Sequence, residues 1–388
     1  MNTVIDFDIV ISRFGTHASK YDNNLLYLGT NDVIPLSVAD MDFAAPPQVM
    51  EALLQRAAHP IYGYTIYPES LYQVFIDWIQ KRHGWTIKRE WIVLSAGIVP
   101  ALFCSVLAYT QQGDGVIIQP PVYQPFFDAI KTNNRQLIEN PLVLNNGRYE
   151  IDFEHLEACA KKARLLLLCS PHNPVGRVFN QEELAHVLDI AQRHDLIVFS
   201  DEIHADLLFA PHKHYPLGQF DTERVLTAFA PSKTFNIAGM NLSALIIPNE
   251  THRKAIQQVF DSVHIGSANP FSITAFEAAY QYGEPWLEQL LSYLTANKNL
   301  VAEFLKKETP QIQLIEPEGT FLLWLDCKAL GLTDAQLKDF FVYKAKCGII
   351  PGLVFGRNGS GFVRLNIAAP RSIIELVLRQ IKVAMNSL

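Results

Sequence analysis

Three polar side chains of different chemistry each come soon after a short apolar, strand-like run in this sequence. They are an amine, Lys233, a carboxylate, Asp201, and an amide, Asn173. In an open α/β sheet, the carboxyl ends of neighbouring parallel strands meet in one crevice, so the three groups can converge there. Taken singly, the same residues also permit a surface lysine, a helix N-cap and an ordinary Asn-Pro turn.

These three side chains are the groups that pyridoxal phosphate requires, since this cofactor has an aldehyde, a pyridine ring and a phosphate. Lys233 can form an imine with the aldehyde, because burial near cationic groups favours a neutral amine. A carboxylate at the end of an apolar strand is costly to bury unpaired, and a protonated ring nitrogen would be a partner for Asp201. Asn173 can donate to the ring oxygen. His204 can share that contact, unless it is an ordinary core or surface histidine.

The segment Ser95-Ala96-Gly97-Ile98 has the character of an anion-binding turn. It follows a strand-like run and opens an apolar helix, so the backbone amides of Gly97 and Ile98 can face a phosphate. Ser232 can add a hydroxyl to the same site, and a simple strand-to-helix turn is the alternative. The sequence has no Gly-x-x-x-x-Gly-Lys motif, so a nucleoside triphosphate is not indicated.

Two further side chains complete the candidate site. Tyr123 is held between prolines in Pro120-Pro121-Val122-Tyr123-Gln124-Pro125 and can lie flat on a pyridine ring, although packing also explains a tyrosine. Arg364 lies in an alternating run, with Val363 and Leu365 on the opposite face. Its guanidinium can grip a carboxylate with two hydrogen bonds, and a surface ion pair is the alternative.

The elements that would position these residues alternate between strand-like and helix-like patterns from about residue 90 to 247. Continuous short apolar runs are typical of strands covered on both faces. A helix is predicted over 184–191, with Asn180 and Glu183 as its capping box. The sequence therefore predicts a three-layer αβα large domain with a mainly parallel sheet. Its strand-like runs are 91–94, 116–118, 164–169, 196–199, 225–229 and 243–247.

The C-terminal part has a different pattern. A long helical stretch is predicted from 272 to 307, then strand-like runs at 321–325 and 361–367, and a last helix at 373–385. We predict a smaller α+β domain that the N-terminal segment joins. The predicted division is a large domain of residues 46–275 and a small domain of residues 1–45 and 276–388.

The composition limits the class of protein. The 388 residues are 49% hydrophobic and carry a formal charge of −7, which disfavours nucleic acid as a partner. No apolar run reaches the roughly 18 residues that span a bilayer, and residues 1–8 lack the pattern of a secretory signal. The five scattered cysteines predict buried thiols in a reducing cytoplasm, without a metal or disulfide framework.

In their order and spacing, several motifs make the chain resemble the fold-type-I pyridoxal-phosphate enzymes of the class I/II aminotransferase superfamily. The resemblance covers nearly the whole chain. It is greatest for the MalY/PatB branch, whose members are cystathionine β-lyases or C–S lyases, and the N-terminal motifs point to that branch. The matching segments are Phe14-Gly15-Thr16-His17, Lys20-Tyr21-Asp22, Val38-Ala39-Asp40-Met41-Asp42-Phe43, Tyr62-Gly63-Tyr64, Ser170-Pro171-His172-Asn173-Pro174-Val175-Gly176, Ser200-Asp201-Glu202-Ile203-His204, Ser232-Lys233-Thr234-Phe235-Asn236-Ile237-Ala238-Gly239, Pro317-Glu318-Gly319-Thr320-Phe321 and Val363-Arg364-Leu365-Asn366.

The resemblance implies a role for each matching residue. The implied catalytic residues are Lys233, Asp201 and Tyr64. The implied cofactor-binding residues are Gly97, Ile98, Tyr123, Asn173, Asp201, His204, Ser232 and Lys233. The implied substrate-binding residues are Ala39, Tyr64, Asn173 and Arg364. No metal is implied.

Two positions qualify what the resemblance implies. Relatives are homodimers whose sites take a tyrosine from the neighbouring subunit, and Tyr64 matches that position. Many aminotransferases place an arginine on the phosphate eight residues after the imine lysine, where this chain has Asn241. An aspartate-type aminotransferase is therefore less expected, and the phosphate would need other donors.

The activity that the resemblance implies is α,β-elimination on cystathionine, cysteine or a related thioether. Lys233 would remove the Cα proton as general base, and the products would be a thiol, pyruvate and ammonia. An aminotransferase is the nearest alternative, because both reactions begin with loss of that proton. A regulatory protein that keeps the fold is a further alternative. No membrane partner is expected.

Overall fold

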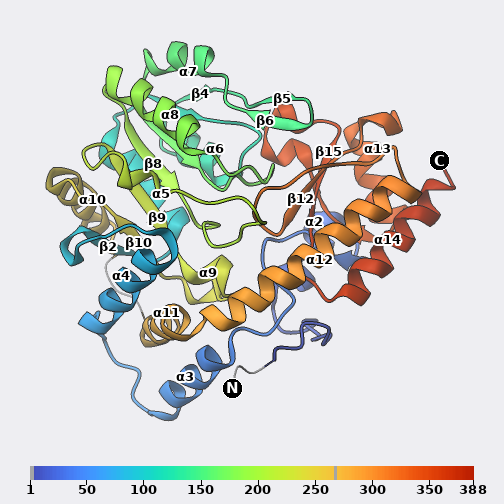
Figure 1. Ribbon diagram of the computed structural model, residues 1–388, viewed down its shortest axis with the longest axis horizontal. Helices are drawn as coiled ribbons and strands as arrows, with labels where there is room; N and C mark the ends of the chain where they lie inside the picture. The colour runs from blue at the N-terminus through green and yellow to red at the C-terminus, as the bar shows by residue number, and fades with distance from the viewer. Residues whose placement is uncertain (1–3, 266–268) are drawn as a thin grey trace.

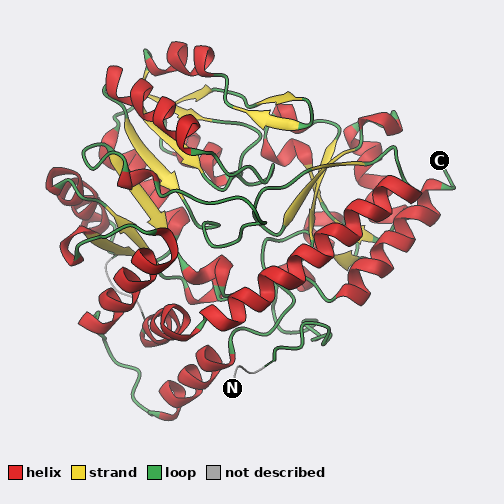
Figure 2. Cartoon of the chain, viewed as in Figure 1, coloured by secondary structure: helices red, strands yellow, loops and turns green. Residues whose placement is uncertain are grey.

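A seven-stranded sheet with helices on both faces forms the larger part of the molecule (Figure 1, Figure 2). The computed structural model describes residues 4–265 and 269–388. Strand β10 is antiparallel to both of its neighbours and the other pairs are parallel, which confirms the mainly parallel sheet. The spatial order is β2 (Ile92–Ser95), β10 (Ser243–Ile246), β9 (Val225–Phe229), β8 (Ile197–Asp201), β7 (Ala163–Cys169), β3 (Gly115–Ile118) and β4 (Gln136–Glu139).

Apolar strand residues alternate between two helical layers, which explains the uninterrupted apolar runs. Leu165 and Leu167 of β7 pack in one cluster, and Leu166 and Leu168 pack in another. The predicted capping box of Asn180 with Glu183 is confirmed at the start of α8. The first layer contains α5 (Ile98–Tyr109), α6 (Pro125–Thr132) and α10 (Glu250–Ser262), and the second contains α7 (Phe153–Ala160) and α8 (Gln181–Arg193).

A second sheet is antiparallel and has the order β11 (Gln313–Ile315), β12 (Leu322–Asp326), β15 (Phe362–Asn366) and β14 (Ile350–Pro351). Helices α12 (Glu284–Glu308) and α14 (Arg371–Met385) lie side by side near this sheet (Figure 1). The N-terminal segment contributes β1 (Ile34–Pro35), which pairs in parallel with β13 (Cys347–Gly348). The residue limits of the two domains stay a prediction.

The single helical stretch predicted from 272 to 307 is wrong. Helix α11 (Pro270–Tyr282) ends before Gly283, and α12 begins directly after it. A Cβ on Gly283 would lie 2.3 Å from Cε1 of Phe235, so only glycine fits there. Pro285, in the first turn of α12, also has no amide hydrogen for a continuous helix.

The N-terminal half adds three elements at the edges of the fold. Strand β4 escaped prediction because it has only two apolar residues, Leu137 and Ile138, and lies at the edge of the sheet. Helix α3 (Pro47–Ala58) and the irregular segment 59–68 stand at the periphery, and the segment leads into α4 (Glu69–His83) (Figure 1).

The cysteines agree with the prediction of buried thiols, since Cys104, Cys159, Cys169, Cys327 and Cys347 are all buried and unpaired. Within the described residues, no helix combines the length and the apolar character needed to cross a membrane.

Candidate active site

A cavity of about 650 Å³ lies at the carboxyl ends of the parallel strands, and residues of the second sheet close one side. Every predicted site residue except Tyr64 lines it. The predicted residues in its wall are Ala39, Gly97, Ile98, Tyr123, Asn173, Asp201, His204, Ser232, Lys233 and Arg364.

Lys233 lies on the short helix α9 (Pro231–Thr234), which follows β9. Its Nζ donates a hydrogen bond to the carbonyl oxygen of Ala39 at 2.6 Å. Burial lowers the pKa of Lys233 to about 8, and the carboxylates of Asp40 and Asp201 oppose this effect. A sizeable fraction of the amine is therefore neutral near pH 7 to 8, as a nucleophile or a base requires.

Asp201 is the last residue of β8 and is 6% exposed. Its Oδ1 accepts a hydrogen bond from the amide of Ile203 at 3.1 Å, and a turn follows in place of the helix that an N-cap would open. Burial raises the pKa of Asp201 to about 7. The carboxylate forms no ion pair within the described part of the chain, so a cationic ligand can supply the missing partner.

Arg364 shows the complementary property, a buried cation without an anion. It lies in β15, is 4% exposed, and donates from Nη1 to Oδ1 of Asn173 at 3.0 Å and from Nη2 to the carbonyl oxygen of Ser37 at 2.8 Å. Its Nε has no partner among the described residues, and burial lowers the pKa of Arg364 to about 10. The surface ion pair that the sequence also allowed is wrong, and a substrate carboxylate can complete this site.

His204 offers a neutral ring with an unused nitrogen. The residue is buried, and its Nδ1 has no hydrogen-bond partner in the described structure. Burial, together with the nearby charges of Lys233 and Arg364, lowers the pKa of His204 to about 3. The ring is therefore neutral at physiological pH and can make one more hydrogen bond to a ligand. Tyr123, just before α6, is partly exposed in the same cavity.

The start of α5 forms the wall where the sequence predicts phosphate binding. Gly97 adopts a φ of +127°, a conformation that residues with a Cβ rarely adopt, and Ile98 is the first residue of the helix. Ser232 and Asn241 also line the cavity. The backbone amides, the Ser232 hydroxyl and the side-chain amide of Asn241, which stands where many aminotransferases have an arginine, are donors at this wall.

Tyr64 is the one predicted site residue that the chain does not bring to its own cavity. It is fully exposed on the segment 59–68, between α3 and α4. The neighbouring apolar side chains of Ile61, Tyr62 and Ile66 are exposed as well. Several apolar side chains exposed together are typical of a surface that contacts another chain.

Comparisons with known proteins show which family the chain belongs to. The sequence profile of the family described as aminotransferase class I and II matches residues 31–381. The chain belongs to this family. Cystathionine beta-lyase PatB of Bacillus subtilis (strain 168) is 40% identical over 387 residues, which cover 98% of this chain and 100% of PatB. Protein MalY of Escherichia coli (strain K12) is 32% identical over 376 residues, or 96% of each chain.

A solved structure extends the likeness to three dimensions. Cystalysin from Treponema denticola, whose crystal structure contains a pyridoxal 5'-phosphate cofactor, matches with a TM-score of 0.96 and 38% identity. The match covers 99% of this chain and 100% of cystalysin. The predicted fold class and the predicted resemblance to the class I/II superfamily and its MalY/PatB branch are thus confirmed.

The sequence alone did not show how the N-terminal segment of this aminotransferase-family chain enters the site. Ala39 was predicted as a substrate contact, and in the structure its backbone oxygen binds Lys233. The carbonyl oxygen of Ser37 binds Arg364 in the same way. The side chain of Asn366 donates to the carbonyl oxygen of Val38 at 2.7 Å, which gives a structural role to the last residue of the motif Val363-Arg364-Leu365-Asn366.

Proposed function

We propose that this chain is a pyridoxal-phosphate-dependent carbon–sulfur β-lyase, which performs α,β-elimination on a sulfur-containing amino acid. The observation that carries the proposal is a cavity with one buried acid and one buried cation, both without a charged partner, beside a lysine of lowered pKa. These groups are Asp201, Arg364 and Lys233. The full-length likeness to PatB, a cystathionine beta-lyase, supports elimination as the reaction.

The residues of the cavity fit the polar parts of the cofactor. Asp201 can pair with the ring nitrogen, and the unused Nδ1 of His204 can bind the ring oxygen together with Asn173. The amides at the start of α5 and the hydroxyl of Ser232 can bind the phosphate. When bound, pyridoxal phosphate supplies an electron-withdrawing ring that stabilises negative charge at the Cα of a linked amino acid.

The residues of this chain then have distinct tasks. Arg364 binds the substrate carboxylate and orients the amino acid, so that the Cα–H bond faces Lys233. The Nζ of Lys233 removes the Cα proton, and the C–S bond at Cβ breaks with its electron pair leaving on sulfur. The ammonium of Lys233 can return the proton to the departing thiolate. Asp201 holds a proton on the ring nitrogen throughout. The remaining enamine hydrolyses to pyruvate and ammonia.

An aminotransferase would use the same residues up to the loss of the Cα proton, so the products decide between the two reactions. The holoenzyme is incubated with cystathionine, with cysteine and with another thioether amino acid, and pyruvate and thiol are measured. A parallel set contains a 2-oxo acid, and the transferred amino group is measured. We expect pyruvate and thiol in equal amounts without the oxo acid. Amino transfer alone would refute the proposed lyase.

We propose that the functional unit is a homodimer in which Tyr64 enters the cavity of the neighbouring chain. The exposure of Tyr64 and the apolar side chains around it supports this arrangement. A Tyr64→Ala variant is expected to lose about 10- to 100-fold in kcat/KM for the thioether, because a positioned side chain is removed. Sedimentation velocity checks that the variant stays dimeric.

Mixing an impaired variant with an inactive one tests whether Tyr64 acts across the dimer. In a hybrid of Tyr64→Ala with Lys233→Ala, one of the two sites receives native Lys233 from one chain and native Tyr64 from the other. Random exchange of subunits should then restore about a quarter of wild-type activity, since half of the dimers carry one intact site. If Tyr64 served its own chain, no hybrid site would be intact, and no recovery would occur.

All five cysteines are buried and unpaired, which bears on the compartment in which the protein is located. Free thiols are typical of a reducing compartment, where disulfides do not persist. We therefore propose a cytoplasmic location.

A further inference from the structure

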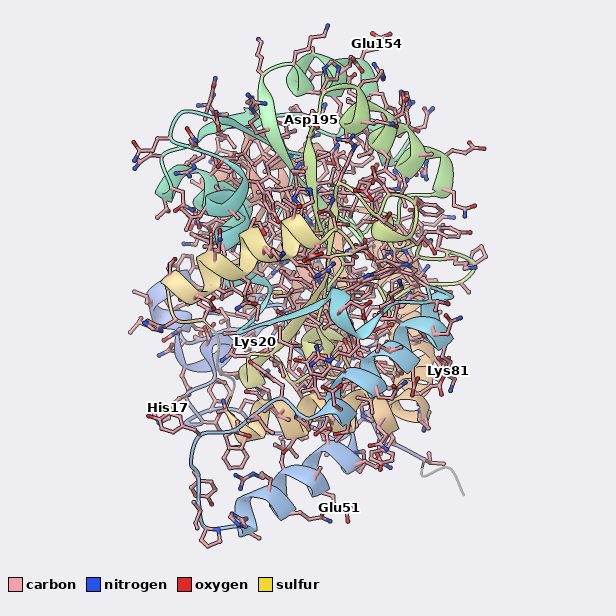
Figure 3. All side chains as sticks on the ribbon, turned by 90° about the vertical axis from the view of Figure 1, so that its left-hand side faces the viewer. His17, Lys20, Glu51, Lys81, Glu154 and Asp195 are labelled. Carbon is pink, nitrogen blue, oxygen red and sulfur yellow. The ribbon has the colours of Figure 1, made fainter. Side chains whose placement is uncertain are left out.

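Lys20 is a fully buried charge that the proposed reaction does not use. It lies on the short helix α1 (Ser19–Asp22) with an exposure of 0%, and it is labelled in Figure 3. Its Nζ donates to Oδ2 of Asp42 at 2.8 Å and to the carbonyl oxygen of Asp40 at 3.3 Å. Lysine is almost never completely buried, and its burial is costly unless carboxylates surround it.

The Nζ of Lys20 also lies 3.7 Å from Oδ1 of Asp40, and a second cation binds the carboxylates of the same two aspartates. Arg13 donates from Nη2 to Oδ2 of Asp40 at 2.6 Å and from Nη1 to Oδ1 of Asp42 at 2.8 Å. Two cations from the N-terminal segment thus neutralise two carboxylates that lie close together in the motif Val38-Ala39-Asp40-Met41-Asp42-Phe43. Lys20 and the two aspartates belong to motifs to which the sequence assigned no role.

The segment that these charges hold, residues 37–42, presents backbone oxygens to both cationic residues of the active site. The carbonyl oxygen of Ser37 accepts from Arg364 and that of Ala39 accepts from Lys233, at 2.8 and 2.6 Å. A shift of this segment would therefore move the acceptors that aim the guanidinium and the amine. The charged groups that act on Lys233 are Asp40, Arg364 and Asp201, and Asp40 belongs to the segment itself.

Neutral side chains anchor the same segment from the rest of the fold. Asn366 donates from Nδ2 to the carbonyl oxygens of Val38 and Asp40, both at 2.7 Å. The amide of Met41 donates to Oδ1 of Asn236 at 2.9 Å. These bonds hold the backbone, while the two carboxylates of the segment interact with Arg13 and Lys20, and the hydroxyl of Tyr21 also lies against Asp42. Without those cations, the buried carboxylate of Asp42 would face the partly exposed carboxylate of Asp40 with too little opposite charge nearby.

We propose that Lys20 and Arg13 are positioning residues. They hold segment 37–42 in place, so that its backbone oxygens keep the side chains of Lys233 and Arg364 oriented toward the substrate. Neither residue touches the reacting atoms. The proposal rests on the proposed function for its kinetic consequence alone, since the order of the segment can be measured without turnover.

Hydrogen exchange in the holoenzyme tests the structural step. In a Lys20→Met variant, which keeps the apolar stem and removes the charge, the amides of Met41 and Asp42 should exchange about tenfold faster or more. These amides are now bonded to Asn236 and to the carbonyl oxygen of Ala368. Strands β7 and β8 should keep wild-type rates. Lys81→Met, at an exposed ion pair with Glu284, is the matched control and should change neither region.

Kinetics test the functional step. We expect the KM of Lys20→Met for the amino acid to rise about tenfold, because Arg364 loses a fixed acceptor, with a smaller fall in kcat. Lys20→Arg should recover much of the loss, and so should the pair Lys20→Met with Asp42→Asn, which removes the one negative charge that Arg13 alone does not balance. If Lys20→Met does not fold, Arg13→Met, at a half-buried position, takes its place.

Two results would overturn the proposal. One is wild-type exchange at Met41 and Asp42 together with a wild-type KM. The other is faster exchange throughout the sheet, which would reveal a general loss of stability without a role for this segment. A wild-type enzyme that releases no thiol would refute the lyase and leave the exchange result standing.

Discussion

The Lys233→Ala variant is expected to release no measurable pyruvate or thiol from cystathionine, with turnover lowered about 10³-fold or more. The amine is both the group that would bind the cofactor aldehyde and the base that faces Cα, so one substitution removes two functions. Its bond to the carbonyl oxygen of Ala39 holds the amine inside the cavity, and burial there lowers its pKa to about 8. The measurement is pyruvate release at saturating substrate, with cofactor added.

Two observations accompany this assay. The visible absorbance of the lysine-bound cofactor should be missing from Lys233→Ala, while its thermal stability stays near wild type. Lys213→Ala, the same substitution at an exposed lysine, should leave turnover and absorbance unchanged. Undiminished turnover of Lys233→Ala would remove this residue from the mechanism.

The second large effect is expected for Asp201→Asn, which keeps the shape of the side chain and removes its charge. Asn cannot hold a proton on the ring nitrogen, so negative charge at Cα is no longer stabilised through the ring. We expect kcat to fall about 10²- to 10⁴-fold, the usual range for loss of a positioned acid or base. Steady-state rates and the bound cofactor, measured by absorbance, separate loss of chemistry from loss of binding.

The raised pKa of Asp201 adds a pH-dependent test of the same residue. With a pKa of about 7, the carboxyl is mostly protonated at pH 6 before the cofactor binds, and a cationic ring would lower that pKa. Asp201 should therefore release a proton on binding at pH 6 and none at pH 8.5, where it is already ionised. Calorimetry in two buffers of different ionisation enthalpy counts the protons. Equal proton release by wild type and Asp201→Asn at pH 6 would contradict the assigned pairing.

Much of the fold could be predicted because strands buried on both faces leave short apolar runs, as at 116–118 in β3 and 165–168 in β7. The exceptions have physical causes. Strand β4 lies at the edge of the sheet and is only partly buried, so its sequence contains both polar and apolar residues. The break at Gly283 was missed because helical periodicity continues across it, although Pro285, which has no amide hydrogen, is a local signal that a new helix begins.

The site was predictable where residue type carries the chemistry. An amine, an acid and an amide at the ends of strands led to Lys233, Asp201 and Asn173, and the structure brings all three to one cavity. Backbone contacts leave no such signal, because any residue at position 39 offers a carbonyl oxygen. The burial of Lys20 depends on carboxylates that come later in the chain, and its residue type alone indicates a surface position.

The walls of the cavity come from three parts of the polypeptide that are remote from one another, namely the N-terminal segment, the large sheet around Lys233 and the strand that carries Arg364. Contacts between parts that are distant in sequence form slowly, because a long stretch of chain must lose conformational entropy before the contact contributes stabilising free energy. During renaturation, helical content should therefore return before the protein regains its affinity for a ligand. Uptake of the cofactor would then report the completion of folding.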